Sequence, residues 1–385
     1  MENIAIIAVG YNRPDSMKQL LQSLLRVDYL GMQVDLIISI DRGQRQSEIV
    51  EVAEGLVWNV GNKKLRVFPE RQGLRSHIIQ CGDYTEEYDA VVVLEDDLLV
   101  SPAFFSYVIQ ALRFYSNDAK IAGISLYRHY IHPGVNRPFE PENNGFDTFL
   151  MQYAMSWGQC WTREMWKGFR RWYGENDNAD LSRDSKLPRY ISNWNSHSWL
   201  KYYMRYIVET DKYFVYPYFS LTTNESILGE HCHIPNNDYQ VPMQEVPRDY
   251  SFSSFNEAVK YDVFFERKGI ESYVFPDLCG RKVMDLYGCR DDFDGAQYIL
   301  STRSLPFKLI QRIQLKYRPI EKNCIDPTDG DGIILYDARI QSKCPKLKKV
   351  FLIRYDVKNL HWKKLLYLGW KEFLYALSNK VRRKK

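Results

Sequence analysis

A chain of 385 residues, 45% of them apolar, is long and apolar enough to bury a large core in one or two domains, which excludes global disorder. The net charge of +4 gives no overall case for nucleic-acid binding, and no run approaches the roughly 18 apolar residues of a membrane-spanning helix. The charge is uneven, because residues 343–385 hold 14 basic residues and only two acids. This asymmetry marks the tail as a separate functional element.

The chain has seven cysteines, an odd number, and no two of them form a C-x-x-C pair. The apolar stretch at residues 4–9 is too short for the core of a secretory signal. These features predict reduced thiols in a cytoplasmic protein. His231, Cys232 and His233 have the residue types of a zinc site. No second ligand pair at a suitable spacing completes such a site, so we expect Cys232 to be an ordinary thiol.

The first hundred residues alternate strand and helix signals. The predicted strands cover residues 4–9, 34–40, 65–68 and 90–94, with helical segments between them. This βαβαβ rhythm predicts an α/β fold with a doubly wound, mostly parallel central sheet flanked by helices.

The strand at residues 90–94 is a continuous apolar run, as expected when both faces of a strand are buried, and it leads directly into Glu95, Asp96 and Asp97. Adjacent carboxylates repel one another unless a cation neutralises them. Oxygen ligands of this kind suit Mg²⁺ or Mn²⁺, which usually binds together with substrate phosphates. The run therefore indicates a metal and phosphate site, with a solvated acidic turn as the alternative.

Polar residues follow the other strands as well, with Asn12 and Arg13 after the first strand and Asp41 after the second. The carboxyl ends of parallel strands share one edge of the sheet, where open α/β folds bind nucleotides. Neither the G-x-G-x-x-G nor the G-x-x-x-x-G-K-[ST] pattern occurs at the expected place, which argues against a dinucleotide oxidoreductase and a P-loop NTPase.

The second half of the chain is less regular. Further strands are expected at residues 121–126 and 212–218, and a helix at 194–207. Beyond about residue 240 the signals are mixed. The sequence therefore predicts three regions, which are an α/β domain at 1–240, an extension of unassigned role at 241–342 and a basic amphipathic tail at 343–385.

Four short motifs occur in the order Ala8-Val-Gly-Tyr-Asn-Arg-Pro14, Ser39-Ile-Asp41, Gly73-Leu-Arg75 and Leu94-Glu-Asp-Asp97. In this order they resemble the nucleotide-sugar-dependent glycosyltransferases of GT-A fold, and most of all the bacterial family 2 enzymes and the N-acetylglucosaminyltransferase I type. The resemblance covers roughly residues 3–235. It implies a Rossmann-like GT-A domain and a hexosyltransferase that moves sugar from a UDP-sugar, with inversion, using Mn²⁺ or Mg²⁺.

The resemblance also implies roles for individual residues. Contacts with uridine and ribose fall to four residues, which are Tyr11, Asn12, Arg13 and Asp41. Arg75 would lie near the nucleotide or its diphosphate, Glu95 and Asp96 would hold the nucleotide-sugar, and Asp97 would bind the metal. For Asp41 and Arg75 the alternative is an ordinary surface ion pair.

The chain departs from the family where a Trp-Asp segment supplies the catalytic base. Residues 192–200 contain no carboxylate, and His197 is the general base available there, although a structural histidine is an open alternative. The segment 221–232 resembles a later family motif, which would bring His231 to the metal or diphosphate and make Glu230 a second candidate base. Trp157 resembles a family residue near the donor sugar, with core packing as the alternative.

The basic tail carries apolar residues at helical spacing, namely Trp362, Leu366, Trp370, Phe373 and Leu377. Flanked by lysines, this pattern favours a helix lying on an anionic membrane surface, with a helix packed on the domain as the alternative. The expected enzyme is cytoplasmic, peripheral on the inner face of the membrane, and builds a bacterial surface polysaccharide such as capsule or lipopolysaccharide on a glycan or lipid-linked acceptor. Nucleic acid is not an expected partner. The alternatives are a sugar nucleotidyltransferase and a non-catalytic nucleotide-sugar or glycan-binding module.

Overall fold

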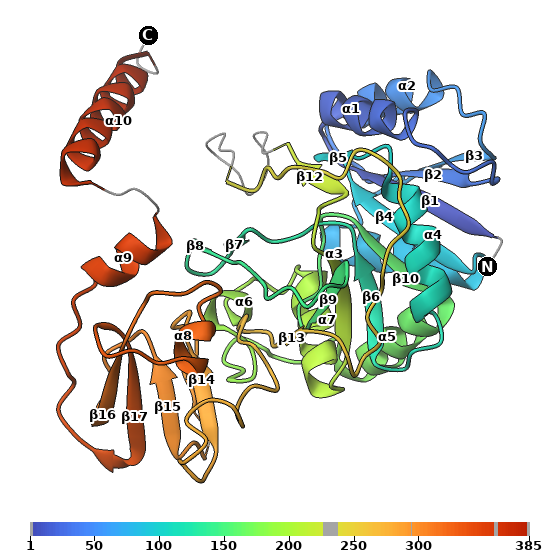
Figure 1. The fold of residues 1–385 in the computed structure, drawn as a ribbon. Coiled ribbons are helices and arrows are strands. Elements are labelled where there is room, and N and C mark those ends of the chain that lie inside the picture. Colours follow the sequence, from blue (N-terminus) through green and yellow to red (C-terminus); the bar gives the residue numbers. More distant parts are fainter. Residues whose placement is uncertain (1–2, 226–237, 294, 358–360, 383–385) are drawn as a thin grey trace. The chain divides into compact units, whose positions relative to one another are not determined.

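The computed structural model describes residues 3–225, 238–293, 295–357 and 361–382 (Figure 1). It divides the chain into two compact units. Unit 1 comprises Met1–Ser272 with Cys289–Asp294, and unit 2 comprises Tyr273–Gly288 with Gly295–Lys385. Residues 241–272, which the sequence interpretation assigned to the extension, therefore fall in unit 1.

Unit 1 is built on a nine-stranded sheet. Its strands, in spatial order, are β13 (Lys260–Tyr261), β9 (Thr148–Met151), β11 (Tyr213–Pro217), β6 (Ile121–Ser125), β10 (Gln159–Thr162), β4 (Ala90–Glu95), β1 (Ile4–Gly10), β2 (Asp35–Ile40) and β3 (Lys63–Val67). Five of the neighbouring pairs are parallel, and β10 runs antiparallel to both of its neighbours. The predicted α/β class with a mostly parallel central sheet is confirmed.

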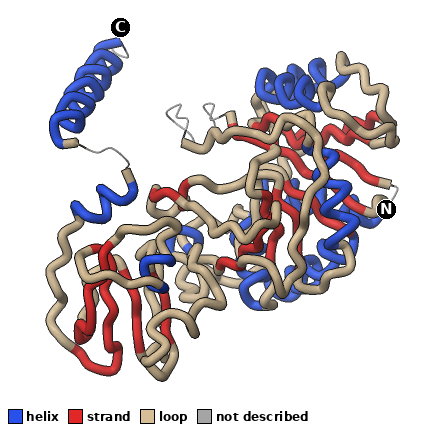
Figure 2. The backbone as a smooth tube through the Cα atoms, viewed as in Figure 1, coloured by secondary structure: helices blue, strands red, loops and turns tan. Residues whose placement is uncertain are grey.

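Helices cover this sheet, and Figure 2 shows its strands lying between them. The helices of unit 1 are α1 (Pro14–Leu24), α2 (Gln46–Glu54), α3 (Leu74–Gly82), α4 (Phe104–Tyr115), α5 (Arg163–Asn176), α6 (Arg189–Ser192) and α7 (Trp199–Glu209). All seven residues of β1 and five of the six in β4 are buried, so both faces of the central strands are covered. This explains why those strands read as unbroken apolar runs in the sequence.

A turn and a short strand follow β4, and they position the acidic residues at the end of β4. After the turn at Asp96 and Asp97 the chain forms β5 (Leu98–Val100), which pairs antiparallel with β12 (Thr222–Asn224). A second small ladder joins β7 (Ile131–His132) to β8 (Arg137–Pro138). The pairing of β5 with β12 brings the segment after residue 221 beside the acidic turn, although more than a hundred residues separate them in the chain.

Unit 2 contains a four-stranded sheet of its own. Its strands, in spatial order, are β14 (Lys282–Asp285), β15 (Tyr298–Ser301), β17 (Gly332–Gln341) and β16 (Phe307–Gln314). Helices α8 (Lys322–Ile325), α9 (Val350–Asp356) and α10 (Trp362–Arg382) complete it. The sequence predicted no elements for this sheet. Its strand β16 mostly alternates half-buried and exposed residues, so it shows no continuous apolar run.

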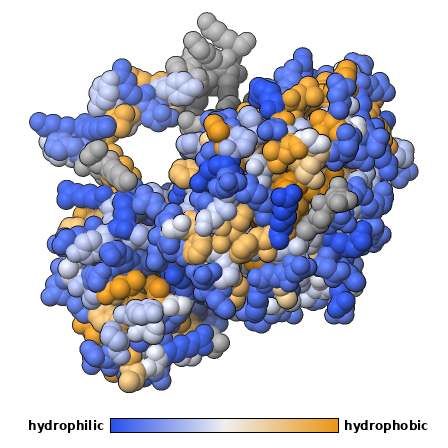
Figure 3. Space-filling model, turned by 45° about the vertical axis from the view of Figure 1, so that its right-hand side comes forward, coloured by the Kyte–Doolittle hydropathy of each residue, from blue (hydrophilic) through white to orange (hydrophobic). Residues whose placement is uncertain are grey.

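The tail forms the expected helix. Every described side chain of α10 from Trp362 to Leu377 is exposed, including Trp362 at 61% and Trp370 at 60%. Elsewhere the surface in view is mostly hydrophilic, with apolar residues gathered in separate patches (Figure 3). Within the described residues, no helix combines the length and apolar character needed to cross a membrane.

Candidate active site

The turns that follow β1 and β4 are bound together at the carboxyl edge of the sheet. The Arg13 guanidinium donates to Asp96 and, at 3.1 Å, to Oδ2 of Asp97. The backbone N–H of Tyr11 donates to the other oxygen of Asp96 at 3.0 Å. The structure thus brings Tyr11, Arg13 and the acidic turn to one place, and it uses the Arg13 side chain to neutralise part of the acidic charge.

The acidic turn has more negative charge than Arg13 can balance. Burial raises the pKa of Asp96 to about 6, even though Arg13 opposes the shift. Burial of its carboxyl group, together with the charges of Asp97 and Asp96, raises the pKa of Glu95 to about 8 against the opposing effect of Arg13. A site in which carboxylates are this reluctant to ionise is short of positive charge.

Glu225 joins this cluster, and the sequence interpretation missed it. It follows β12, and its backbone N–H donates to the carbonyl oxygen of Asp97 at 2.8 Å. Burial, and then the charge of Asp97, raise the pKa of Glu225 to about 7. Its signal was its place in the segment 221–232, from which Glu230 and His231 were chosen instead. Glu230 and His231 lie outside the described residues.

The residues present fit a divalent cation. Oδ1 of Asp97 and Oε2 of Glu225 are buried and have no hydrogen-bond partner among the described residues, which is costly for a carboxylate oxygen unless something else binds it. No cluster of three or more His, Cys, Asp or Glu side chains suited to a metal occurs in the described part of the chain. This donor set suits Mg²⁺ or Mn²⁺, which commonly takes one or two carboxylates and completes its shell with phosphate oxygens and water.

Asp41 has a structural task at the same edge. Its buried carboxylate accepts backbone N–H groups from Arg42 at 2.8 Å, from Gln72 at 2.7 Å and from Gly73 at 3.0 Å. These bonds fix the loop between β3 and α3. Asp41 is therefore not part of a surface ion pair with Arg75, because it is buried and its described hydrogen bonds go to backbone groups.

Arg75 is an anchor for two distant segments. Its Nε donates to the Tyr173 hydroxyl at 2.6 Å, its Nη1 donates to the Ser196 carbonyl at 3.1 Å, and its Nη2 donates to the Asp177 carbonyl. The guanidinium also lies 4.1 Å from the centre of the Tyr202 ring. Arg75 therefore holds the segment that precedes α7 against the start of α3.

His197 lies within that segment. It is exposed, and its backbone N–H donates to Oδ1 of Asn195 at 2.9 Å, while Ser198 caps α7. In the described structure its imidazole makes no hydrogen bond with the acidic turn. The contact between Arg75 and Ser196 nevertheless keeps this segment next to the loop that Asp41 shapes.

Trp157 lies beside β12, the strand that leads to Glu225. Its carbonyl accepts the Thr222 hydroxyl at 2.6 Å, and its ring packs against Tyr127 and Tyr239 with centroids 4.8 and 4.9 Å apart. The ring is half-buried, so one part of it remains accessible. The adjacent Gly158 has φ +96°, and a Cβ there would come within 2.9 Å of the Thr222 methyl, so this close approach requires glycine.

The nucleoside candidates Tyr11 and Asn12 form the outer rim of the edge. Asn12 adopts a φ of 56°, and its Oδ1 accepts the backbone N–H of Arg45 at 3.0 Å. The guanidinium of Arg71 lies 4.9 Å from the centre of the Tyr11 ring. An aromatic ring and a guanidinium at such a rim offer planar surfaces on which a base can stack.

Comparison with known proteins gives remote matches. No family model and no curated protein matches the chain. Among solved structures it is similar to S. aureus TarS 1–349 in complex with UDP-GlcNAc (13% identity, 60% of each chain, TM-score 0.38). It is also similar to the mannosyltransferase PcManGT from Pyrobaculum calidifontis in complex with GDP-Man and Mn²⁺ (14% identity, 44% of this chain and 46% of that chain, TM-score 0.31). The matches span less than two thirds of those chains, and similarity this low assigns neither a family nor an activity.

The raised pKa of Glu95 predicts how stability depends on pH. Above about pH 6.5 the unfolded chain has lost this proton while the folded chain keeps it, so the folded state loses stability as pH rises towards about 8. Buried histidines such as His129, whose pKa burial lowers to about 3, are neutral in the folded state but partly protonated in the unfolded chain near pH 6.5, so they oppose this slope equally in the wild type and in a Glu95 variant. Relative to Glu95→Gln, we expect the free energy of unfolding of the wild type to fall by about 1 kcal/mol per pH unit.

The measurement is urea unfolding of the wild type and of Glu95→Gln between about pH 6.5 and pH 8. Glu95→Gln should flatten the slope, and Glu164→Gln, which changes an exposed acid on α5, should leave it unchanged. The same pH dependence of stability in the wild type and in Glu95→Gln would contradict the assignment.

Proposed function

We propose that this protein is a metal-dependent glycosyltransferase that moves a sugar from a UDP-sugar to an acceptor hydroxyl with inversion. The observation that carries the proposal is the pair of buried carboxylate oxygens of Asp97 and Glu225, which have no partner among the described residues and lie at the carboxyl edge of a mostly parallel sheet. Carboxylates so placed suit a cation that arrives with a diphosphate. The motif order in residues 8–97 supports the nucleotide-sugar part of the proposal.

In this proposal Asp97 and Glu225 hold Mn²⁺ or Mg²⁺. A cation there would supply neutralisation of the departing UDP diphosphate. Arg13 keeps Asp96 and Asp97 in place, Tyr11 and Asn12 contact the uridine, and Trp157 faces the donor sugar. Asp41 and Arg75 act through the loops that they shape, and Glu95 and Asp96 hold the nucleotide-sugar.

Inverting transfer needs a base to take the proton from the acceptor hydroxyl as it attacks the sugar. His197 is our first candidate, because it is exposed and lies in the segment that Arg75 ties to α3. Glu230 is the second candidate. A non-catalytic nucleotide-sugar-binding module would need neither, and the experiments below separate it from an enzyme.

We further propose a setting in bacterial surface polysaccharide synthesis, with a glycan or lipid-linked acceptor and with α10 on an anionic membrane. The support is the exposed apolar stripe of this helix, which includes Trp362 and Trp370, together with lysines on its other faces. Aromatic residues and lysines in such an arrangement favour the interface between lipid and water.

The first prediction from this proposed function concerns the donor site. Calorimetry with UDP should detect tight binding in Mn²⁺, and removing the metal should abolish most of it, because the diphosphate would then meet uncompensated carboxylates. Asp97→Asn should weaken binding in Mn²⁺ at least about tenfold, which corresponds to about 1.4 kcal/mol.

Asp249→Asn is the matched control, because Asp249 is an exposed carboxylate of unit 1 and should keep wild-type affinity. Absence of UDP binding under every metal condition would overturn the nucleotide-sugar proposal. Tight binding without hydrolysis or transfer of any UDP-sugar would favour the binding module.

The second prediction concerns the base. His197→Gln should lower kcat for transfer by about 10² to 10⁴ while leaving UDP affinity unchanged, since removal of a general base affects the chemical step. Steady-state rates and calorimetry on the same samples measure both. A full loss of kcat in Glu230→Gln with a normal rate in His197→Gln would move the assignment to Glu230.

The third prediction concerns the tail. Replacing Lys363, Lys364 and Lys371 with Gln should weaken binding to phosphatidylglycerol vesicles about a hundredfold, because each lysine contributes about 1 kcal/mol at an anionic surface. Cosedimentation of the full chain measures this. The exposed lysines Lys18, Lys167 and Lys186 provide a charge-matched control, and equal losses in both variants would contradict the role of α10.

A further inference from the structure

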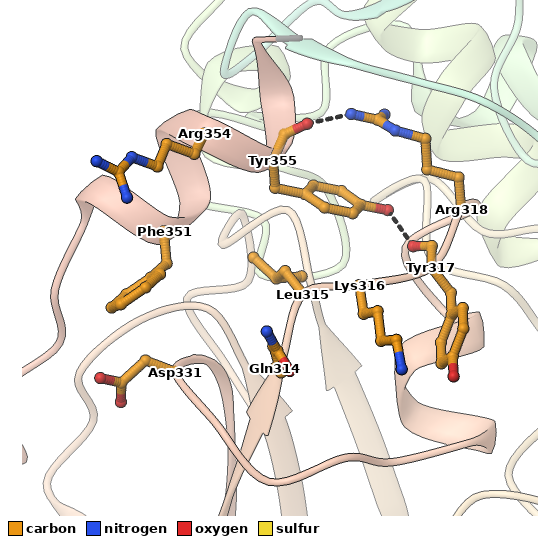
Figure 4. A pocket seen from close by; sticks show the side chains of 9 residues that line it. All are labelled: Gln314, Leu315, Lys316, Tyr317, Arg318, Asp331, Phe351, Arg354 and Tyr355. Carbon is orange, nitrogen blue, oxygen red and sulfur yellow. Dashed lines mark hydrogen bonds between the residues drawn. The ribbon is translucent and has the colours of Figure 1, made fainter. Parts of the chain in front are cut away.

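Unit 2 contains a cleft of about 550 Å³ at one end of its sheet, between the end of β16 and helix α9 (Figure 4). It is formed where β16 finishes at Gln314 opposite Gly332, the first residue of β17. The side chains that matter for its chemistry are Lys316, Tyr317, Arg318, Phe351, Arg354 and Tyr355. None of these residues belongs to the candidate active site, which lies in unit 1.

The floor of the cleft is rigid. The buried side chain of Asn323 accepts the backbone N–H groups of Lys316 and Tyr317, both at 2.7 Å, and donates to the Tyr317 carbonyl at 2.8 Å. The Tyr355 hydroxyl donates to that same carbonyl at 2.7 Å. Figure 4 shows this bond together with the one from Arg318 to the Tyr355 carbonyl, so α9 is tied to the strand end at two points. A pre-organised wall lowers the entropy cost of binding.

The cleft carries an excess of positive charge. Lys316 and Arg354 are exposed, and within the described residues neither has an acidic partner. The one acid of the lining, Asp331, is already paired with Arg312 at 2.7 Å. The Arg318 guanidinium lies 4.4 Å from the centre of the Tyr355 ring, which holds it in a fixed plane. Among the described residues, the cleft therefore presents Lys316 and Arg354 without acids to neutralise them.

Aromatic rings accompany these cations. Tyr317, Phe351 and Tyr355 contribute three rings to the lining. Aromatic rings pack on the apolar C–H surfaces of sugar rings, and guanidinium and ammonium groups bind carboxylates and phosphates. A small inorganic anion would gain nothing from the rings, and a neutral glycan would gain hydrogen bonds from the cations but no attraction between opposite charges. A ligand that uses both is a sugar chain that bears anionic groups.

We propose that this cleft binds an anionic glycan, whose carboxylates or phosphates contact Lys316 and Arg354 and whose sugar rings pack on Phe351 and Tyr355. This glycan would be the acceptor of the transferred sugar. That part of the inference rests on the proposed function, whereas the binding site itself does not. The cleft gives unit 2 a task that neither its sequence nor the donor site explains.

The test is calorimetry on the full chain with two anionic probes, tetragalacturonate for carboxylates and a phosphorylated maltotetraose for phosphates, and with neutral maltotetraose for comparison. The double variant Lys316→Gln with Arg354→Gln should weaken binding of the preferred anionic probe at least tenfold. Phe351→Ala should also weaken it, without changing its dependence on salt, because the ring carries no charge.

The matched control is the double variant Lys282→Gln with Lys308→Gln, which removes the same charge from the same sheet at residues outside the cleft. Equal losses in the two double variants would overturn the proposal, as would equal affinity for neutral maltotetraose. Inorganic phosphate that competes as well as the glycan would reduce the cleft to an anion site and overturn the glycan assignment. Binding only to phosphatidylglycerol vesicles would overturn it in favour of lipid.

UDP binding measured on the same samples separates this inference from the proposed function. The cleft variants should bind UDP as the wild type does, and Asp97→Asn should bind the glycan as the wild type does. Glycan binding in a protein that never binds UDP would support the glycan site and refute the proposed transferase. UDP binding without glycan binding would refute the glycan site and support the donor site.

Discussion

The repulsion among carboxylates at the end of β4 is the constraint on which the rest of unit 1 depends. Asp96 and Asp97 share the guanidinium of Arg13, and Glu225 adds a further acid whose backbone is bonded to Asp97. A fold does not keep such charge together for stability, because each buried carboxylate raises the cost of ionising the next. The raised pKa values of Glu95, Asp96 and Glu225 record that cost. A cation with phosphates would remove it, which is the physical basis of the proposed donor site.

Much of unit 1 is predictable because its strands are buried on both faces. The runs at 4–9 and 90–94 are apolar at every position, so each identifies a strand without knowledge of its neighbours. Parallel strands then place their carboxyl ends on one edge, and the meeting of Arg13 with Asp96 follows from that topology. The structural roles of Asp41 and Arg75 could not be predicted. Asp41 binds backbone groups of a loop, and Arg75 binds backbone carbonyls and the side chains of Tyr173 and Tyr202, about a hundred residues or more away along the chain.

The parts that could not be predicted depend on pairing across long stretches of chain. β5 and β12 have three residues each, too few to show periodicity, and their register alone brings Glu225 to Asp97. Without that register, Glu230 and His231 looked more suitable because of the motif that they resemble. The elements of unit 2 were not predicted for another reason. Strand β16 mostly alternates half-buried and exposed residues. The turn that follows it is held by the Asn323 side chain and not by an apolar run.

The distribution of charge is why we propose different kinds of ligand for the two units. In unit 1 a cluster of acids needs a cation, and an anionic donor can bind there only when a metal reverses the sign of the site. In unit 2 Lys316 and Arg354 attract anions directly, and no metal is required. Acidic and basic groups so close in one site would pair with each other, as Arg13 does with Asp96 and Asp97, and would lose much of their attraction for ligands. Keeping them on separate units would let one chain hold the proposed diphosphate through a metal, and the proposed anionic glycan without one.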